Sequence, residues 1–194
     1  MRKDLFDKIA PVYGMFFGFQ VKNFRTVLDK AVSGINIPEH TSFLDIGCGT
    51  GALTFALSER GYRVTGADAA PQMIKRAKER NASNKTAFVV GDVLSGLDFD
   101  SKSFDDVIAS YVAHGMNEMD RKKLYDEAAR LARKMIIFHE YNQKRTLGSD
   151  LIEWLEGGDY FNFIKIAEIE MKEYFGNVQV IPVSKKSAWY VVEL

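Results

Sequence analysis

The chain has 194 residues, which is enough for one domain with a substantial core. Hydrophobic residues make up 46% of the chain and charged residues 27%, the ordinary balance of a globular protein. The formal net charge is zero, which weighs against functions that need broad attraction to nucleic acid or to an anionic membrane.

Cysteine content and the first residues bear on the compartment. Cys48 is the single cysteine, so no intramolecular disulfide can form, as is usual in a reducing compartment. The uncharged stretch at residues 9–21 is too short to span a bilayer, and no signal-peptide cleavage site follows it. We therefore expect a cytoplasmic protein without a membrane span.

Residues 1–34 are expected to form two helices, and Gly34 ends the second. The second helix has apolar residues at helical spacing, namely Val21, Phe24, Leu28 and Ala31. An aromatic cluster interrupted by two glycines precedes it, formed by Tyr13, Phe16, Phe17 and Phe19. This cluster could be ordinary core. Because the glycines let the chain bend, we favour the alternative that the cluster belongs to a lid that closes over the ligand.

Short apolar segments then alternate with helix-like segments. The segments expected to form strands are residues 42–47, 62–68, 86–92, 104–111 and 134–140. Pro71 opens one of the intervening helices, where its missing N–H is not needed, and Asn117 can cap another. This alternation predicts a parallel sheet with helices on both faces.

The C-terminal part departs from the alternation. After a helix over roughly residues 160–175, the segments 177–183 and 188–194 are joined by only four residues, so they must pair as an antiparallel hairpin. Pro182 cannot donate to a sheet ladder, which places its strand at the edge of the sheet. We therefore predict an α/β fold with a mostly parallel seven-stranded sheet that ends in an antiparallel hairpin.

The segment FLDIGCGTG, residues 43–51, ends the first strand with three glycines in five positions. Gly47, Gly49 and Gly51 permit a tight turn and close approach of the backbone to a ligand. From Gly47 onward the sequence also satisfies the G-x-G-x-x-G/A pattern of dinucleotide sites. Asp68, at the end of the second strand, stands where a ribose-binding acid belongs for either cofactor. The glycine pattern alone therefore leaves the cofactor open.

Charge separates the two cofactors better. No Lys or Arg occurs from Asp45 to Glu59, and Asp45 and Asp92 place carboxylates at the same crevice. The negative pyrophosphate of a dinucleotide would be repelled by these carboxylates. S-adenosylmethionine has no phosphate and carries a sulfonium and an ammonium, besides a carboxylate that backbone N–H groups can hold. A carboxylate before the loop therefore favours S-adenosylmethionine.

Three motifs, in order and together with the seven-strand layout, resemble those of class I S-adenosylmethionine-dependent methyltransferases with a Rossmann-like fold. They are LDIGCGTG at 44–51, VTGADAAPQM at 64–73 and GDV at 91–93. The resemblance implies that the three glycines line the methionine and ribose, that Asp45 contacts the amino group, and that Asp68 binds the ribose hydroxyls. It further implies that Ala69, Met73, Asp92 and Val93 contact the adenine, and that Ser110 and Tyr111 lie beside the methionine moiety.

This resemblance implies one methyltransferase domain over residues 1–194. Within it, residues 1–34 would be a helical N-terminal lid and residues 35–140 the cofactor-binding core. Residues 141–194 would be an acceptor-side region with the terminal hairpin. Plain turn-forming roles for the glycines and Asp92, and a helix-start role for Asp68, are the alternatives. Cys48 is expected to fill a small space in the loop.

Candidate residues for the acceptor side follow the fourth and fifth strands. His114 is the first candidate for a general base and Tyr111 the second. Contacts with the acceptor are expected from Tyr13, Phe17, His139 and Tyr141. A surface position for His114 and a buried structural role for His139 are open alternatives. The spacing of His139 and Glu140 does not suggest a metal site.

The segment after the fourth strand also bears on the kind of acceptor. SYVAHG stands at 110–115, where an NPPY-like motif would indicate methylation of nucleobase amines. We therefore expect a small-molecule acceptor and no nucleic-acid partner, and the sequence makes no prediction about oligomeric state. Two other functions remain open, a nucleotide-binding NAD(P)-type oxidoreductase and a protein that binds S-adenosylmethionine without turnover.

Overall fold

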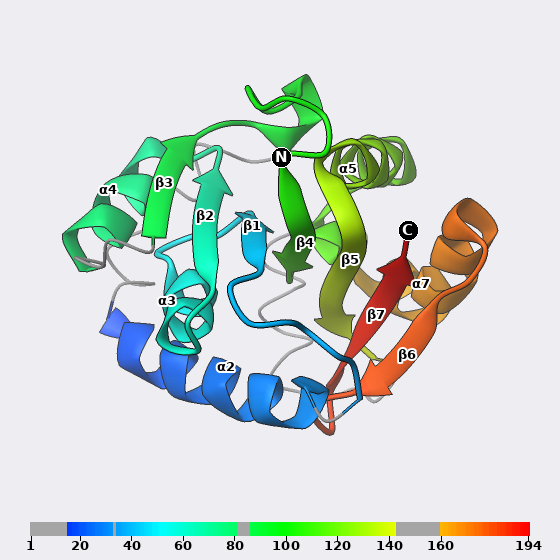
Figure 1. Cartoon of the computed structure of the whole chain (residues 1–194). Helices are drawn as coiled ribbons and strands as arrows, with labels where there is room; N and C mark the ends of the chain where they lie inside the picture. The colour runs from blue at the N-terminus through cyan, green and yellow to red at the C-terminus, as the bar shows by residue number, and fades with distance from the viewer. Residues whose placement is uncertain (1–14, 33, 81–85, 143–159) are drawn as a thin grey trace.

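The computed structural model describes residues 15–32, 34–80, 86–142 and 160–194. Seven strands form one sheet in the order β3-β2-β1-β4-β5-β7-β6 (Figure 1). The strands are β1 (Ser42–Ile46), β2 (Arg63–Asp68), β3 (Thr86–Val90), β4 (Phe104–Ser110), β5 (Ala132–Tyr141), β6 (Gln179–Pro182) and β7 (Ser187–Glu193). The first five run parallel, and β7 is antiparallel to both β5 and β6. The predicted fold class is confirmed.

The helices lie at the predicted places between and around these strands. They are α2 (Phe17–Val32), α3 (Ala52–Glu59), α4 (Pro71–Arg80), α5 (Glu118–Leu131) and α7 (Tyr160–Phe175), with short 3₁₀ turns η1 (Val93–Ser95) and η2 (Ala113–Gly115). Asn117 caps α5, since its side-chain oxygen accepts from the Asp120 N–H. Pro182 lies in β6, which is the edge strand, as expected from its missing N–H.

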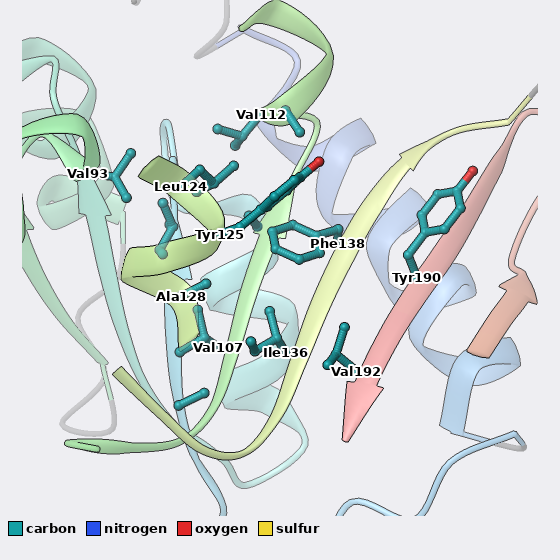
Figure 2. Packing of buried hydrophobic residues seen from close by; sticks show 14 of the residues in the cluster. Val93, Val107, Val112, Leu124, Tyr125, Ala128, Ile136, Phe138, Tyr190 and Val192 are labelled. Atoms are coloured by element: carbon teal, nitrogen blue, oxygen red, sulfur yellow. The ribbon is translucent and has the colours of Figure 1, made fainter. Parts of the chain in front are cut away.

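Successive side chains of a strand point to opposite faces, so the sheet has a core on each side. On one face, α2 and α3 cover residues such as Phe43, Ile108 and Trp189. On the other face, α5 and α7 cover a larger cluster that includes Val107 and Phe138 (Figure 2). The sheet is therefore enclosed between two helical layers, which leaves the ends of its strands as the place for a site.

α2 is built into one of these layers. Its residues Leu28 and Ala31 are fully buried, and Arg25 forms a two-pronged ion pair with Glu59 of α3. The lid hypothesis therefore concerns the residues before α2, of which 1–14, including Tyr13, lie outside the described residues. The division into a lid, a core and an acceptor-side region stays a prediction.

Within the described ranges, no helix combines the length and the apolar character that crossing a membrane requires.

Candidate active site

A narrow cleft lies at the carboxyl ends of the parallel strands, where open α/β sheets bind their ligands. The residues that line it are Ile46, Gly47, Ala67, Asp68, Ala69, Gly91, Val93, Leu97 and Val112. Four predicted cofactor residues meet here, namely Gly47, Asp68, Ala69 and Val93. Asp68 carries the only charge among these described lining residues, so the cleft is otherwise apolar.

The glycine loop after β1 needs its glycines for two reasons. Gly47, Gly49 and Gly51 have φ angles of 70°, 53° and 82°, a left-handed conformation that other residues rarely adopt. In addition, a Cβ at Gly47 would lie 2.5 Å from Cγ2 of Val112, in the turn after β4. The loop after β1 is therefore pressed directly against the turn after β4, and both contribute to the cleft.

Asp68 ties the glycine loop to the start of α4. Its Oδ2 accepts from the Gly49 N–H at 2.9 Å, and its Oδ1 accepts from the Ala70 N–H at 2.8 Å. The carboxylate therefore has the local role that the sequence offered as an alternative, and it still lies in the lining of the cleft. The predicted contact with ribose hydroxyls stays a prediction.

Asp45 is buried behind the loop, with 1% of its surface exposed. The Thr54 hydroxyl of α3 donates to its Oδ2 at 2.6 Å. Burial raises the pKa of Asp45 to about 7, although the bond from Thr54 opposes this shift. The structure thus places Asp45 next to the loop but enclosed by protein, and its contact with a ligand amino group stays a prediction.

The remaining cofactor candidates are placed around the ends of β2 and β3. Asp92 caps η1, because its Oδ1 accepts from the Leu94 N–H at 3.0 Å, which is the turn role considered from the sequence. Met73 and Ala69 are almost completely buried at the start of α4. Their contacts with adenine stay predictions.

Among the residues predicted for the acceptor side, Tyr111 has an unusual backbone. It has a φ of 56°, which is unusual for a bulky residue and typical of functional sites. Its ring lies 4.7 Å from that of Tyr141 and 4.5 Å from that of His139. Although 36% of the Tyr111 surface is exposed, desolvation of its hydroxyl group raises the pKa of Tyr111 to about 12, with a smaller contribution from Glu140. Little phenolate exists at neutral pH, so Tyr111 suits a hydrogen-bonding role better than that of a base.

His114 is buried rather than on the surface, with 5% of its area exposed. Its Nδ1 lies 2.8 Å from Oε2 of Glu140, which is itself fully buried at the end of β5. The other oxygen, Oε1, accepts from the N–H groups of Val112 and Ala113. The His114 ring also meets that of Tyr141 at 5.2 Å. A histidine–carboxylate pair thus adjoins the turn that contributes Val112 to the cleft.

His139 occupies the buried structural position considered from the sequence. Its Nδ1 lies 3.0 Å from the Ser110 hydroxyl and its Nε2 lies 3.1 Å from the Ser187 hydroxyl. Burial lowers its pKa to about 3, so the ring is neutral. In this arrangement Ser110 holds His139, whose ring packs against that of Tyr111. The direct contacts of Ser110 and His139 with ligands stay predictions.

The other predicted acceptor residues do not all come together. Tyr141 lies with Tyr111 and His114, whereas Phe17 lies against Phe55 of α3 and beneath the Arg80 guanidinium of α4. Among the described residues, no group of His, Cys, Asp and Glu has the arrangement of a metal site.

The contacts of two polar residues of the site were not predicted, those of Thr54 and Glu140. Thr54 is the one hydroxyl residue within the apolar run ALTFAL, which could have indicated a buried partner. Glu140 follows the apolar run MIIFH, and an acid at the end of a buried strand could have been paired with His114. Neither contact could be derived from spacing, because both join segments that only the fold brings together.

Comparison with known proteins agrees with this arrangement. Residues 43–135 match the family model described as a methyltransferase domain. The chain is 33% identical over 112 residues, 56% of its length, to the 2-methyl-6-phytyl-1,4-hydroquinone methyltransferase of Synechocystis sp.. It is 32% identical over 82 residues, 38% of its length, to the 23S rRNA (uracil(1939)-C(5))-methyltransferase RlmD of Francisella tularensis subsp. novicida. The chain spans only 34% and 18%, respectively, of the lengths of these two curated relatives.

The fold also agrees with that of a solved structure. A SAM-dependent methyltransferase from Aquifex aeolicus superposes with a TM-score of 0.68 at 15% identity, covering 85% of this chain and 88% of the other. The matched region includes the glycine loop, the acid after β2 and the strand pairs that form the cleft. Residues 43–135 therefore match a methyltransferase domain, and the seven-stranded sheet has the Rossmann-like fold of solved methyltransferases.

Proposed function

We propose that this protein transfers a methyl group from S-adenosylmethionine to a small-molecule acceptor. The observation that carries the proposal is the cleft, which is apolar and has a single carboxylate, Asp68, among its described lining residues. An adenosine without phosphates suits such a surface, whereas a pyrophosphate would lack a cation to pair with. The match to a methyltransferase domain supports the same cofactor.

The residues present fit this cofactor. We expect Asp68 to bind the ribose, and Ala69, Met73, Asp92 and Val93 to surround the adenine. The loop from Gly47 to Gly51, with Asp45 behind it, would receive the methionine portion. When bound, the cofactor supplies a methyl group already activated by its sulfonium. The protein then needs mainly to position the acceptor and to exclude water.

The acceptor site is proposed to lie at Tyr111, His114 and Tyr141. These rings gather beside the cleft, and an aromatic surface suits a flat or apolar molecule. One relative is named for a hydroquinone substrate and another for ribosomal RNA. The zero net charge of the chain favours the small molecule, since binding to RNA relies on basic surface.

Calorimetric titration followed by a methyl-transfer screen tests the proposal. We expect saturable binding of S-adenosylhomocysteine and S-adenosylmethionine, no detectable binding of NADH, and transfer of labelled methyl to a small molecule in the screen. Binding of NADH without a response to S-adenosylhomocysteine would make the protein a nucleotide-dependent enzyme instead. Tight binding without turnover on any acceptor, RNA included, would leave it as a binding protein.

A further inference from the structure

The Glu140 carboxylate organises the turn after β4 with both of its oxygens. Oε1 accepts from the Val112 N–H at 2.8 Å and from the Ala113 N–H at 2.7 Å, and Oε2 lies 2.8 Å from Nδ1 of His114. A fully buried carboxylate is costly unless its oxygens are occupied in this way. Three consecutive residues of the turn are therefore held by one side chain from the neighbouring strand.

The turn needs such an anchor because it begins with a strained residue. The left-handed φ of 56° at Tyr111 is strained for a bulky residue and persists only where neighbours hold it. The Tyr111 N–H donates to the His139 carbonyl at 2.8 Å, and Glu140 holds the next three residues. The same turn brings Val112 into the cleft, so Glu140 fixes where His114 stands relative to the cofactor site.

The hydrogen bonds also fix which nitrogen of His114 carries the proton. The two N–H groups donated to Oε1 stabilise the carboxylate form of Glu140, which can only accept, so the Nδ1–H of His114 donates to Oε2. The lone pair of the neutral ring then lies on Nε2. A carboxylate at Nδ1 also stabilises the imidazolium that forms when Nε2 takes up a proton, as in other histidine bases backed by an acid.

We propose that Glu140 is the positioning residue of a His114 general base, and that the methyl acceptor presents a phenol-type hydroxyl group. The inference rests on the proposed methyl transfer and names its class of substrate. A hydroxyl is a poor nucleophile until its proton is removed, whereas a thiol supplies thiolate by itself. The faces of Tyr111 and Tyr141 suit the ring that carries the hydroxyl.

The step balances without any further reactant. The acceptor oxygen gives its proton to Nε2 of His114 and forms a bond to the methyl carbon, as the carbon–sulfur bond breaks and its electron pair stays on sulfur. The His114 imidazolium is then paired with Glu140 and returns its proton to water. Glu140 keeps its charge throughout and acts only through His114.

Other titratable and charged groups near His114 could also affect its protonation. Tyr111 and Tyr141 face the ring from the ends of β4 and β5. On α7, which packs against η2, Glu170 pairs with Arg121 of α5, and Arg121 also donates to the Met116 carbonyl. Among these described groups, Glu140 is the charged residue that lies within hydrogen-bond distance of the His114 ring. Replacing Glu140 therefore tests the inference directly.

The Glu140→Gln variant provides the sharpest test. Its amide oxygen can still accept from Val112 and Ala113, but its NH₂ group would face Nδ1 of His114 and move the ring proton to Nε2. The chain has three histidines, so ¹⁵N and ¹H NMR can follow His114 individually. We expect a switch of tautomer, a fall of the His114 pKa by at least one unit, and unchanged affinity for S-adenosylhomocysteine.

The matched control is Glu127→Gln. Glu127 is also a buried acid that accepts a backbone N–H, that of Leu97, but its ion-pair partner is Arg130. We expect it to leave the tautomer and pKa of His114 as in the unchanged protein. If Glu140→Gln leaves the His114 tautomer as it was, or if Nε2 carries the proton in the unchanged protein, the inference is wrong.

Turnover provides the second readout, with S-adenosylmethionine labelled in its methyl group and a panel of phenols and thiols as probes. We expect Glu140→Gln to lower kcat on phenols by about 10²–10⁴-fold with little change in KM, and to affect thiols far less. Equal losses on both would make Glu140 purely structural, and turnover of thiols alone would overturn the hydroxyl assignment. Absence of S-adenosylhomocysteine binding in the unchanged protein would instead overturn the proposed function itself.

Discussion

At the scale of single residues, Asp68 has a double task. It accepts N–H groups from the glycine loop and from the start of α4, and it lines the cleft. A carboxylate with four acceptor sites can serve these two bonds and still bind hydroxyl groups of a ligand. The helix-start role and the ribose role, which were alternatives at the level of sequence, are therefore compatible.

Asp68→Asn is expected to weaken binding of S-adenosylhomocysteine by about 10–100-fold, measured by calorimetry. The amide loses the charge, and its NH₂ group must face one of the two backbone N–H groups, so the loop geometry is lost as well. Asp98→Asn, at an exposed position after η1, is the control and should bind normally. Full affinity in a folded Asp68→Asn protein would show that Asp68 only shapes the turn.

The sequence was informative about residues that act locally and uninformative about those that act across the fold. The turn roles of the glycines and the helix-start role of Asp68 could be predicted because a strand, a turn and a helix that are adjacent in the chain produce them. Glu140 and His114 are 26 positions apart, and only the pairing of β4 with β5 brings them together. The role of a buried carboxylate such as Glu140 can be assigned once the register between its strand and the neighbouring strand is known.

At the scale of elements, the sequence predicts the strands and helices well, but it does not predict all of their ends. Pro182 fixed β6 at the edge, and the four-residue connection fixed the hairpin. β5 begins at Ala132, directly after α5 ends at Leu131, two residues before the expected start. Arg133 and Lys134 at that point look like a helix end, yet they pair with Asp105 of β4.

α5 and α7 are joined by a buried ion pair that the sequence did not suggest. Arg121 of α5 binds both oxygens of Glu170 of α7, at 2.8 and 2.6 Å, and Tyr125 donates to the same carboxylate. The Arg121 guanidinium also lies over the Phe163 ring. This group therefore sets the position of α7 over the sheet and, through the Met116 carbonyl, that of the segment after η2.

Arg121→Met should lower the free energy of unfolding by about 3–5 kcal/mol, because Glu170 is left largely buried without its partner. Replacing Glu170 by Met as well should recover most of this loss. Lys122→Met, which breaks the exposed pair with Glu118, should cost less than about 1 kcal/mol. Urea unfolding of the single and double variants measures the coupling; a coupling energy near zero would mean that the two side chains act independently.

At the scale of the whole molecule, buried ionisable groups act on stability in opposite directions as pH changes. The pKa of Asp45 is raised to about 7 in the folded protein, from 3.8, so the folded state binds the proton more tightly. Asp45 therefore lowers stability as pH rises from about 4 to 7. The pKa of His139 is lowered to about 3, so His139 lowers stability as pH falls through 6.5.

A comparison of Asp45→Asn with the unchanged protein isolates the first effect, because all other groups cancel in the difference. We expect the unchanged protein to gain roughly 1–3 kcal/mol relative to the variant on going from pH 8 to pH 5. Urea unfolding at the two pH values measures this difference. Identical differences at both pH values would mean that Asp45 is ionised in the folded protein throughout the range.

The contact between Gly47 and Val112 has a consequence for how such an enzyme can diversify. Because a side chain at either place is limited by the other, enlarging residue 112 to reshape the acceptor side would also intrude on the loop after β1. Variation that broadens the range of acceptors should therefore avoid this pair and accumulate at rings such as Tyr141, which belongs to the proposed acceptor site and does not line the cleft. A directed-evolution library would do best to keep Gly47 and Val112 fixed and to randomise position 141.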